Sequence, residues 1–329
     1  MTVEHEFAPF IRILGKGKTG TRSLTKEEAH QAMGMILDDK VRPEQLGAFL
    51  MLLRVKEESD DELLGFVEAC RQHISSPLDI QADLDWASYA GKRRHNNWYL
   101  LAALALADAG IKVLMHGAAG HTAGRQYSEN TLAALGIAAS QSPEAANIAI
   151  TENSFAFMPL GAFLPKLADI IELRSVLGLR SPVHTLSRLL NPAGLTSSMQ
   201  SVFHPSYAPN HQSAAQKLGQ KNAVVFKGEA GEVEYRPNAD QQLFLLDNGE
   251  AMTEQWQRQI DGRVEIQSEL TVNELKAVWQ TGECSDYARQ AIVGTIAVAL
   301  RMRGEARGQQ QAWSIAEGLW DQRNRKRLR

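Results

Sequence analysis

The hydrophobic residues of the first 77 positions repeat with the period of a helix. Apolar side chains spaced by three and four residues predict three short helices, each with one buried face. Thr25 with Glu28, and Ser59 with Glu62, fit capping boxes, in which a hydroxyl and a carboxylate satisfy backbone N–H groups at the start of a helix. The apolar stretches run through 29–37, 46–53 and 63–70. We therefore predict a small helical bundle as an N-terminal domain over residues 1–77.

Beyond Pro77 the pattern changes to short apolar runs that alternate with longer helical stretches. Such alternation is typical of an α/β domain, in which helices cover a sheet. The strand-like runs are Trp86–Tyr89, Lys112–Met115, Phe155–Met158 and Ala223–Phe226. We therefore predict a larger α/β domain over residues 78–329.

The composition describes an ordinary folded chain of 329 residues, 44% hydrophobic and 22% charged, long enough for about two domains. Its two cysteines, Cys70 and Cys284, form no CxxC pair, so the sequence supports neither a disulfide framework nor a structural zinc site. The longest apolar run, Trp98–Ala107, is about half of the roughly 20 residues that a membrane helix needs. Glu4 and Glu6 stand where a signal peptide would be basic. We expect a cytoplasmic protein with no membrane contact and with no metal or cofactor.

Charge is unevenly distributed although the formal net charge is only −3. Residues 1–91 hold 10 basic and 16 acidic residues, whereas 91–125 hold five basic residues and the single acid Asp108. Residues 300–329 hold eight basic and three acidic residues. Basic segments in a near-neutral chain are typical of a surface that binds nucleic acid or phosphate. The alternative interpretation is a solvated helix face followed by a frayed tail.

Two local motifs are weak indicators of function. Gly15–Gly20 matches GxGxxG, but a helix-like segment precedes it and the next helix begins only near Thr25, which excludes a dinucleotide-binding turn. Lys16 and Lys18 in this loop could touch phosphates, or the loop could simply be exposed. His116 and His121 lack nearby carboxylate or thiolate companions, so a metal site there is not favoured.

Several motifs in one order resemble the anthranilate phosphoribosyltransferase family, the family 3 glycosyltransferases and nucleoside phosphorylases. They are Ser23–Ala29, Gln45–Leu50, Leu53–Lys56, Asp61–Leu63, His116 with Gly117, Leu132–Gly136, Phe157–Pro159, Arg174–Arg180 and Asn191–Ala193. The likeness extends from about residue 8 to about residue 320. It implies an N-terminal helical domain, a central mixed sheet flanked by helices, and a homodimer formed through the helical domain.

The residues that this family uses to bind its donor are largely replaced. The family cradles phosphoribosyl pyrophosphate on a Gly-Thr-Gly-Gly-Asp loop, and Tyr89–Arg94 stands in that place with only Gly91 retained. The family's Asn-Val-Ser-Thr, which places hydroxyls on phosphate and Mg²⁺, corresponds to Asn97–Leu100. His116 and Gly117 remain from the next motif, and Glu232 aligns with one acid of the metal-binding pair. Because phosphoribosyl transfer depends on metal-held pyrophosphate, these replacements predict a loss of catalysis.

The replacements resemble those of the family's non-catalytic branch, which implies a homodimer that binds nucleic acid, DNA or RNA, without sequence preference. We expect phosphate contacts to dominate the affinity. Arg174 and Arg180 could instead be structural, paired with Asp169 or Glu172. The alternatives are a glycosyl or phosphoribosyl transferase with an altered donor site, and an inactive scaffold that binds another protein. The expected phosphate-binding residues are Lys92, Arg93, Arg94, Arg174, Arg180, Lys16, Lys18, Arg323, Arg325, Lys326 and Arg327.

Overall fold

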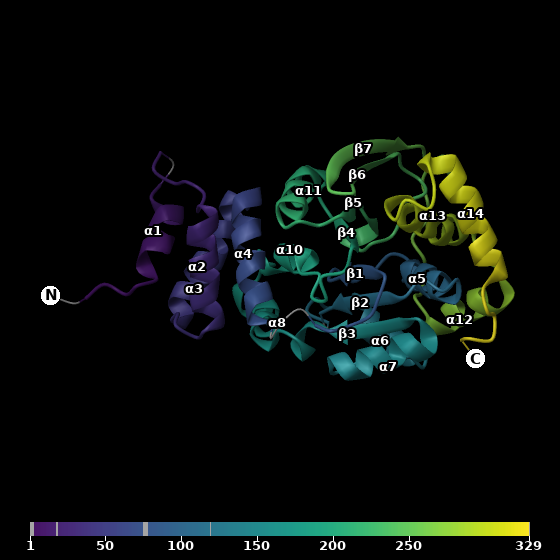
Figure 1. Ribbon diagram of the computed structural model, residues 1–329, viewed down its shortest axis with the longest axis horizontal. Helices are drawn as coiled ribbons and strands as arrows, with labels where there is room; N and C mark the ends of the chain where they lie inside the picture. Colours follow the sequence, from purple (N-terminus) through teal and green to yellow (C-terminus); the bar gives the residue numbers. More distant parts are fainter. Residues whose placement is uncertain (1–2, 18, 75–77, 119, 329) are drawn as a thin grey trace.

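The N-terminal segment forms a bundle of four helices at one end of the molecule (Figure 1). The computed structural model describes residues 3–17, 19–74, 78–118 and 120–328. Both predicted capping boxes are present, at Thr25 and at Ser59. Phe49 packs between Phe7 and Phe66, with ring centroids 5.2 and 6.2 Å away. The helices are α1 (Ala8–Gly15), α2 (Lys26–Leu37), α3 (Pro43–Lys56) and α4 (Asp60–His73).

The rest of the chain is built on one mixed sheet of seven strands in the order β3-β2-β1-β4-β5-β6-β7. The first five strands along the chain run parallel, β6 pairs antiparallel with β5, and β7 pairs antiparallel with β6. The strands are β1 (Leu84–Ser88), β2 (Val113–Gly117), β3 (Phe155–Pro159), β4 (Ser197–Val202), β5 (Asn222–Lys227), β6 (Gln241–Asp247) and β7 (Glu250–Trp256). All four predicted strands are confirmed, and so is the α/β class with its helical N-terminal part.

Alternate residues of the strands supply two separate cores. Leu84 and Trp86 of β1 face one core, whereas Ala87 and Leu114 belong to the other. The second core continues without a break into the apolar residues of the bundle, whose helix α4 contacts α10 (Val183–Leu186) and α11 (Ala208–Lys217). Figure 1 shows the C-terminal helices at the end of the molecule opposite the bundle. The first core also contains residues of α5 (Trp98–Asp108), α12 (Val272–Thr281), α13 (Asp286–Met302) and α14 (Gly308–Gln322).

The remaining helices connect the strands, and most of their buried apolar residues belong to the second core, whereas Leu132 of α6 belongs to the first. α5 explains the long apolar run of the sequence, because ten of its residues are buried between the sheet and α13. No helix in the described ranges is long and apolar enough to span a membrane. The connecting helices are α6 (Ser128–Ala134), α7 (Pro143–Asn153), α8 (Pro165–Glu172), α9 (Arg174–Leu177), α10 (Val183–Leu186) and α11 (Ala208–Lys217).

Two helical glycines provide a matched test of the packing between α2 and α4. A Cβ on Gly65 would lie 2.2 Å from the carbonyl oxygen of Lys26, whereas a Cβ on Gly34 would meet nothing within 4 Å. We expect Gly65→Ala to lower the free energy of unfolding by about 1–3 kcal/mol or more, because the backbones must move apart. Gly34→Ala should raise it by about 0.5–1 kcal/mol through helix propensity. Urea unfolding of both variants tests this, and equal effects would contradict the close approach of the two helices.

Candidate functional site

The loops after β1, β4 and β5 meet at the carboxyl edge of the sheet. β1 pairs with β2 on one side and with β4 on the other, so the connections leave in opposite directions at this point. In open α/β sheets such a switch point leaves a crevice beyond the strand ends, where ligands commonly bind. The three loops are 89–97, 203–207 and 228–240, and their residues line the two clefts described next.

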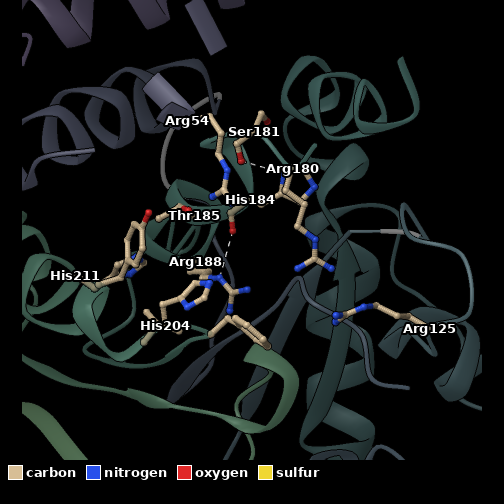
Figure 2. Close-up of a pocket in the computed structure, with 12 residues that line it drawn as sticks. Arg54, Arg125, Arg180, Ser181, His184, Thr185, Arg188, His204 and His211 are labelled. Carbon is tan, nitrogen blue, oxygen red and sulfur yellow. Dashed lines mark hydrogen bonds between the residues drawn. The ribbon is translucent and has the colours of Figure 1, made fainter. Parts of the chain in front are cut away.

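The first cleft lies between the bundle and the sheet and is rich in cations. Its volume is about 260 Å³. Arg54 reaches it from α3, and Arg188 lies in its floor within the 3₁₀ turn Ser187–Leu189. Figure 2 shows the guanidinium groups of Arg125 and Arg180 pointing into the cavity from its other side. The remaining lining residues are Ser181, His184, Thr185, Val202, Phe203, His204, Tyr207 and His211.

A second cleft of about 200 Å³ adjoins the first, because Arg125 and Phe203 line both. Its other lining residues are Arg93, Arg94, Lys227, Gly228, Glu229, Ala230 and Arg236. The two clefts together make a basic groove, which we define by Arg54, Arg93, Arg94, Arg125, Arg180, Arg188, Lys227 and Arg236.

The cations of the basic groove are poorly neutralised by the protein itself. Within the part of the chain that the structure describes, their one ion pair joins Arg236 to Glu229 at 3.7 Å. Burial lowers the pKa of Arg180 to about 10, and the positive charge of Arg125 contributes to the same shift. Burial likewise lowers the pKa of Arg125. Crowded like charges without carboxylate partners favour the binding of an anion.

The carboxylate of Glu232 binds the backbone N–H groups of the loop after β1. Glu232 accepts hydrogen bonds from the backbone N–H groups of Ala90 and Gly91, both at 2.6 Å, and from the hydroxyl of Ser88 at 2.8 Å. Arg125 donates to the carbonyl oxygens of Ala90 and Gly91 at 3.0 and 2.7 Å, and Arg180 donates to that of Ala90 at 3.0 Å. The N–H groups that would cradle a phosphate therefore already have an anionic partner.

The residues that follow this loop do not fit a pyrophosphate and its metal. The side-chain amide of Asn97 donates to the hydroxyl of Thr131 at 3.0 Å, and Trp98 and Tyr99 are buried beside it. The described residues contain no group of three or more His, Cys, Asp or Glu side chains that could hold a metal ion. This segment therefore offers neither an exposed hydroxyl group for a pyrophosphate nor a carboxylate cluster for Mg²⁺.

The expectation that Lys92 contacts phosphate is corrected by its position. Its side chain is fully buried, forms an ion pair with Glu234 and donates to the carbonyl oxygen of Asn96 at 2.6 Å. Burial raises the pKa of Glu234 to about 7, while the charge of Lys92 opposes that shift. Lys92 is thus an internal counter-ion, whereas its neighbours Arg93 and Arg94 are exposed at the groove, as a phosphate-binding role requires.

The C-terminal segment is folded against the domain through Leu328, so the alternative of a frayed tail is wrong. Arg323 is 4% exposed, lies 3.7 Å from the ring centroid of Trp320 and donates to three backbone carbonyls. The expected phosphate contact of Arg323 is therefore corrected, because its charge is committed to this packing. Arg327 pairs with Asp108 at 2.6 Å, and Arg325 and Lys326 are exposed.

Arg174 and Arg180 do not pair with Asp169 or Glu172 in the described structure. Arg174 donates to the carbonyl oxygen of His121 at 3.3 Å instead. Both arginines thus hold the loops around the groove through backbone carbonyls, since Arg180 does the same at Ala90. Phosphate binding by their remaining N–H groups stays a prediction.

The other expected residues lie apart from the basic groove or inside the protein. Lys16 is exposed in the loop after α1, and Lys18 lies outside the described residues. His116 is buried between the hydroxyl of Tyr89, 2.6 Å away, and the carboxylate of Asp85, 3.1 Å away. Gly117 is required by packing, because a Cβ there would lie 2.2 Å from the carbonyl oxygen of Ser88.

Several groove residues were not anticipated from the sequence. Arg125 stood in the basic stretch 91–125 but had no assigned role, so charge clustering was a usable signal for it. Arg54, Phe203 and Arg236 come from three distant segments with no local motif. The pairing of β4 with β5 brings Phe203 and Arg236 to the same edge of the sheet, and the packing of the bundle against α10 and α11 adds Arg54.

Comparison with known proteins gives matches over nearly the whole chain. Residues 8–74 match the glycosyl transferase family, helical bundle domain, and residues 82–321 match the glycosyl transferase family, a/b domain. The uncharacterized protein YbiB of Escherichia coli (strain K12) is 29% identical over 83% of this chain and 86% of its own. An anthranilate phosphoribosyltransferase of Desulfitobacterium hafniense (strain Y51) is 32% identical over 70% of this chain and 68% of its own.

Solved structures agree on the fold. The anthranilate phosphoribosyltransferase of Thermus thermophilus superposes with a TM-score of 0.79 at 22% identity, covering 94% of each chain. The enzyme of Saccharomyces cerevisiae in complex with PRPP and Mg gives a TM-score of 0.78 at 16% identity, covering 97% of this chain and 94% of its own.

Proposed function

Because the chain belongs to the glycosyl transferase family that joins a helical bundle to an a/b domain, we propose that it keeps this scaffold and binds nucleic acid in place of the family's donor. The basic groove supports the proposal, since its cations lie at the position where α/β sheets bind ligands, and in the described residues only Arg236 among them has a carboxylate partner. A polyanion would supply the missing negative charge. Binding of this kind acts on phosphates and is independent of base sequence.

The closed loop after β1 also supports a function other than phosphoribosyl transfer. Glu232 holds the N–H groups of Ala90 and Gly91, so a donor pyrophosphate would have to displace a buried carboxylate. Arg125 and Arg180, which bind the carbonyl groups of this loop, nevertheless line the groove. The proposed ligand therefore lies over the loop and touches side chains, while the backbone cradle stays occupied.

The salt dependence of binding tests the groove directly. Arg54, Arg93 and Arg94 are exposed and make no ion pair in the described structure, so their removal should leave the fold intact. Each lost phosphate contact should lower the log–log salt slope by about 0.9 on duplex or about 0.7 on single strands. We expect Arg54→Ala, Arg93→Ala and Arg94→Ala together to flatten the slope by about two to three units.

The matched control removes three exposed cations outside the groove, namely Lys16, Arg325 and Lys326. Its slope should stay close to that of the wild type, measured by fluorescence anisotropy with DNA at several salt concentrations. If the control variant flattens the salt slope more than the groove variant does, the binding site lies outside the groove. Absence of any salt-dependent binding by the wild type would refute the proposed function.

We further propose that the chain forms a homodimer through the bundle side of the molecule. Val55 on α3 and Val176 on α9 are 84% and 79% exposed, and the two helices touch where Leu177 packs on Gly47. Exposed apolar side chains in one region favour a protein contact. Light scattering should give about twice 36.3 kDa, and Val55→Asp with Val176→Asp should give the monomer mass. A wild-type monomer at micromolar concentration would contradict the proposal.

The alternative function is a glycosyl or phosphoribosyl transferase with an altered donor site. The family match favours it, and the occupied loop at Ala90 and Gly91 argues against it. Calorimetry with phosphoribosyl pyrophosphate and Mg²⁺ separates the two functions. Mg²⁺-dependent binding by the wild type would favour the transferase, whereas the proposed function expects no heat of binding.

A further inference from the structure

Phe203 is placed unlike the other phenylalanines of the chain. All ten phenylalanines lie in the described part, and the side chain of Phe203 is the most exposed of them, at 52%. It follows directly after β4, at the carboxyl edge of the sheet, and lines both clefts of the basic groove. A half-exposed apolar ring where two cationic clefts meet is suited to contact a ligand.

The Cβ of Phe203 lies beside the turn after β5, although its ring is exposed. Gly231 has a φ of +89°, and the Cβ of Phe203 lies 3.4 Å from the point where a Cβ of Gly231 would be. The ring of His204 meets that of Phe203 edge to face, with centroids 4.8 Å apart, and Tyr207 lies 6.5 Å beyond His204. One short loop thus presents a row of three aromatic side chains. The first of them, Phe203, lies beside the turn after β5.

Cations flank this aromatic row on two sides. Arg54 and Arg180 belong to the first cleft, Arg93 and Arg94 belong to the second, and Phe203 lines both. A nucleic-acid strand that lies across the groove would therefore place its phosphates near arginines on each side of the Phe203 ring. A base between those phosphates would meet the ring.

We infer that Phe203 is a stacking platform for an unpaired base and gives the groove a preference for single-stranded nucleic acid over duplex. This inference rests on the proposed function. In a duplex each base is already stacked on its neighbours and shows only its edges in the grooves, whereas a single-stranded base can turn its face onto an aromatic side chain. Every base has such a face, so stacking of this kind agrees with binding that ignores sequence.

A self-association patch is the competing explanation of an exposed apolar side chain. The neighbours of Phe203 argue against it, because they are arginines, a lysine and histidines, which a second copy of the same groove would repel. Val55 and Val176, by contrast, lie on the helices of the bundle side. The test therefore includes the oligomeric state of Phe203→Ala, which should equal that of the wild type.

The test compares Phe203→Ala with the wild type on three probes: single-stranded oligothymidylate, its duplex with oligoadenylate, and an abasic strand of the same length. We expect Phe203→Ala to bind oligothymidylate about five- to one-hundredfold more weakly, the loss typical of one stacked base. Its affinity for the duplex and for the abasic strand, and its salt slope, should stay at the wild-type values. Phe203→Trp should keep the affinity for oligothymidylate, and Phe203→Leu should lose it, because leucine is apolar but has no aromatic face.

Ile148→Ala is the matched control, since Ile148 is 59% exposed on α7 and lies outside both clefts. It should bind all three probes like the wild type. Equal affinity of the wild type for oligothymidylate and the abasic strand would overturn the stacking role while leaving the proposed function intact. The same holds if Phe203→Ala weakens all probes equally or changes the oligomeric state. A wild type that binds none of the probes would overturn both.

Discussion

Replacing Lys92 with alanine should lower the free energy of unfolding by about 3–5 kcal/mol, the usual cost of leaving one member of a buried ion pair without its partner. Lys92 and Glu234 are both fully buried, and Lys92 also donates to the carbonyl oxygen of Asn96. Chemical unfolding measures the loss. The adjacent Arg93→Ala is the control, because Arg93 is exposed and should change stability by less than about 0.5 kcal/mol.

The loss in Lys92→Ala should depend on pH. Burial raises the pKa of Glu234 to about 7 in the wild type, and removal of Lys92 removes the charge that opposes this shift. A carboxyl whose pKa is raised on folding contributes stability below its unfolded pKa and loses it as the pH rises through the folded pKa. The variant should therefore be least stable above pH 7 and recover toward pH 5.

A double variant separates the ion pair from the surrounding packing. Lys92→Met with Glu234→Leu removes both charges and should recover much of the stability lost in Lys92→Ala. If Lys92→Ala and Arg93→Ala have the same free energy of unfolding at every pH, Lys92 is not an internal counter-ion. Phosphate binding by Lys92 would then again be the preferred interpretation.

Glu232→Ala should destabilise the chain and make it responsive to phosphate. The substitution leaves the N–H groups of Ala90 and Gly91 without a partner, and each unsatisfied buried group costs about 1–3 kcal/mol. It also removes the negative charge near Arg188, whose pKa Glu232 raises against the larger lowering by burial. Two convergent N–H groups beside arginines are an anion site, so inorganic phosphate should bind there. At a phosphate concentration of about 100 times Kd the stabilisation should be about 2.7 kcal/mol.

Unfolding in phosphate and in chloride at equal ionic strength measures this rescue. The wild type should gain less stability from phosphate than Glu232→Ala does, because its own carboxylate occupies the loop and leaves only the groove cations to bind the anion. Glu250→Ala controls for the change in net charge, since Glu250 is exposed at the start of β7. A Glu232→Ala protein that is destabilised but indifferent to phosphate would show that the loop no longer has the shape of an anion site.

The sequence by itself determined those parts of the fold whose causes are local. The capping boxes at Thr25 and Ser59 depend on residues three positions apart, so they were readable without a structure. β1, β2, β3 and β5 were readable because their apolar residues follow one another along the chain.

β6 was missed although its apolar run at 243–246 was a usable signal, whereas β4 and β7 needed tertiary partners. All six residues of β4 are buried, but Ser198, Gln200 and Ser201 are polar and were not recognised as a strand. The hydroxyl of Ser198 donates to Asp85 at 2.7 Å and that of Ser201 to the carbonyl oxygen of Gly231 at 2.6 Å. β7 has an exposed outer edge and thus no continuous apolar run. Hydrogen bonds to distant segments, which replace apolar burial here, leave no periodic trace in the sequence.

The candidate site shows the same division more sharply. The sequence established a cluster of three cations at 92–94, but it could not distinguish them, since adjacent residues of like charge look equivalent. The tertiary structure turned Lys92 inward onto Glu234, which is 142 residues away, and left Arg93 and Arg94 outside. It also joined them to Arg54 and Phe203 from other segments. Local chemistry therefore determined which charges the chain carries, and packing decided which of them reach a ligand. A buried charge is tolerated only where polar partners from elsewhere in the chain meet it, as Glu234 meets Lys92 and backbone carbonyls meet Arg323.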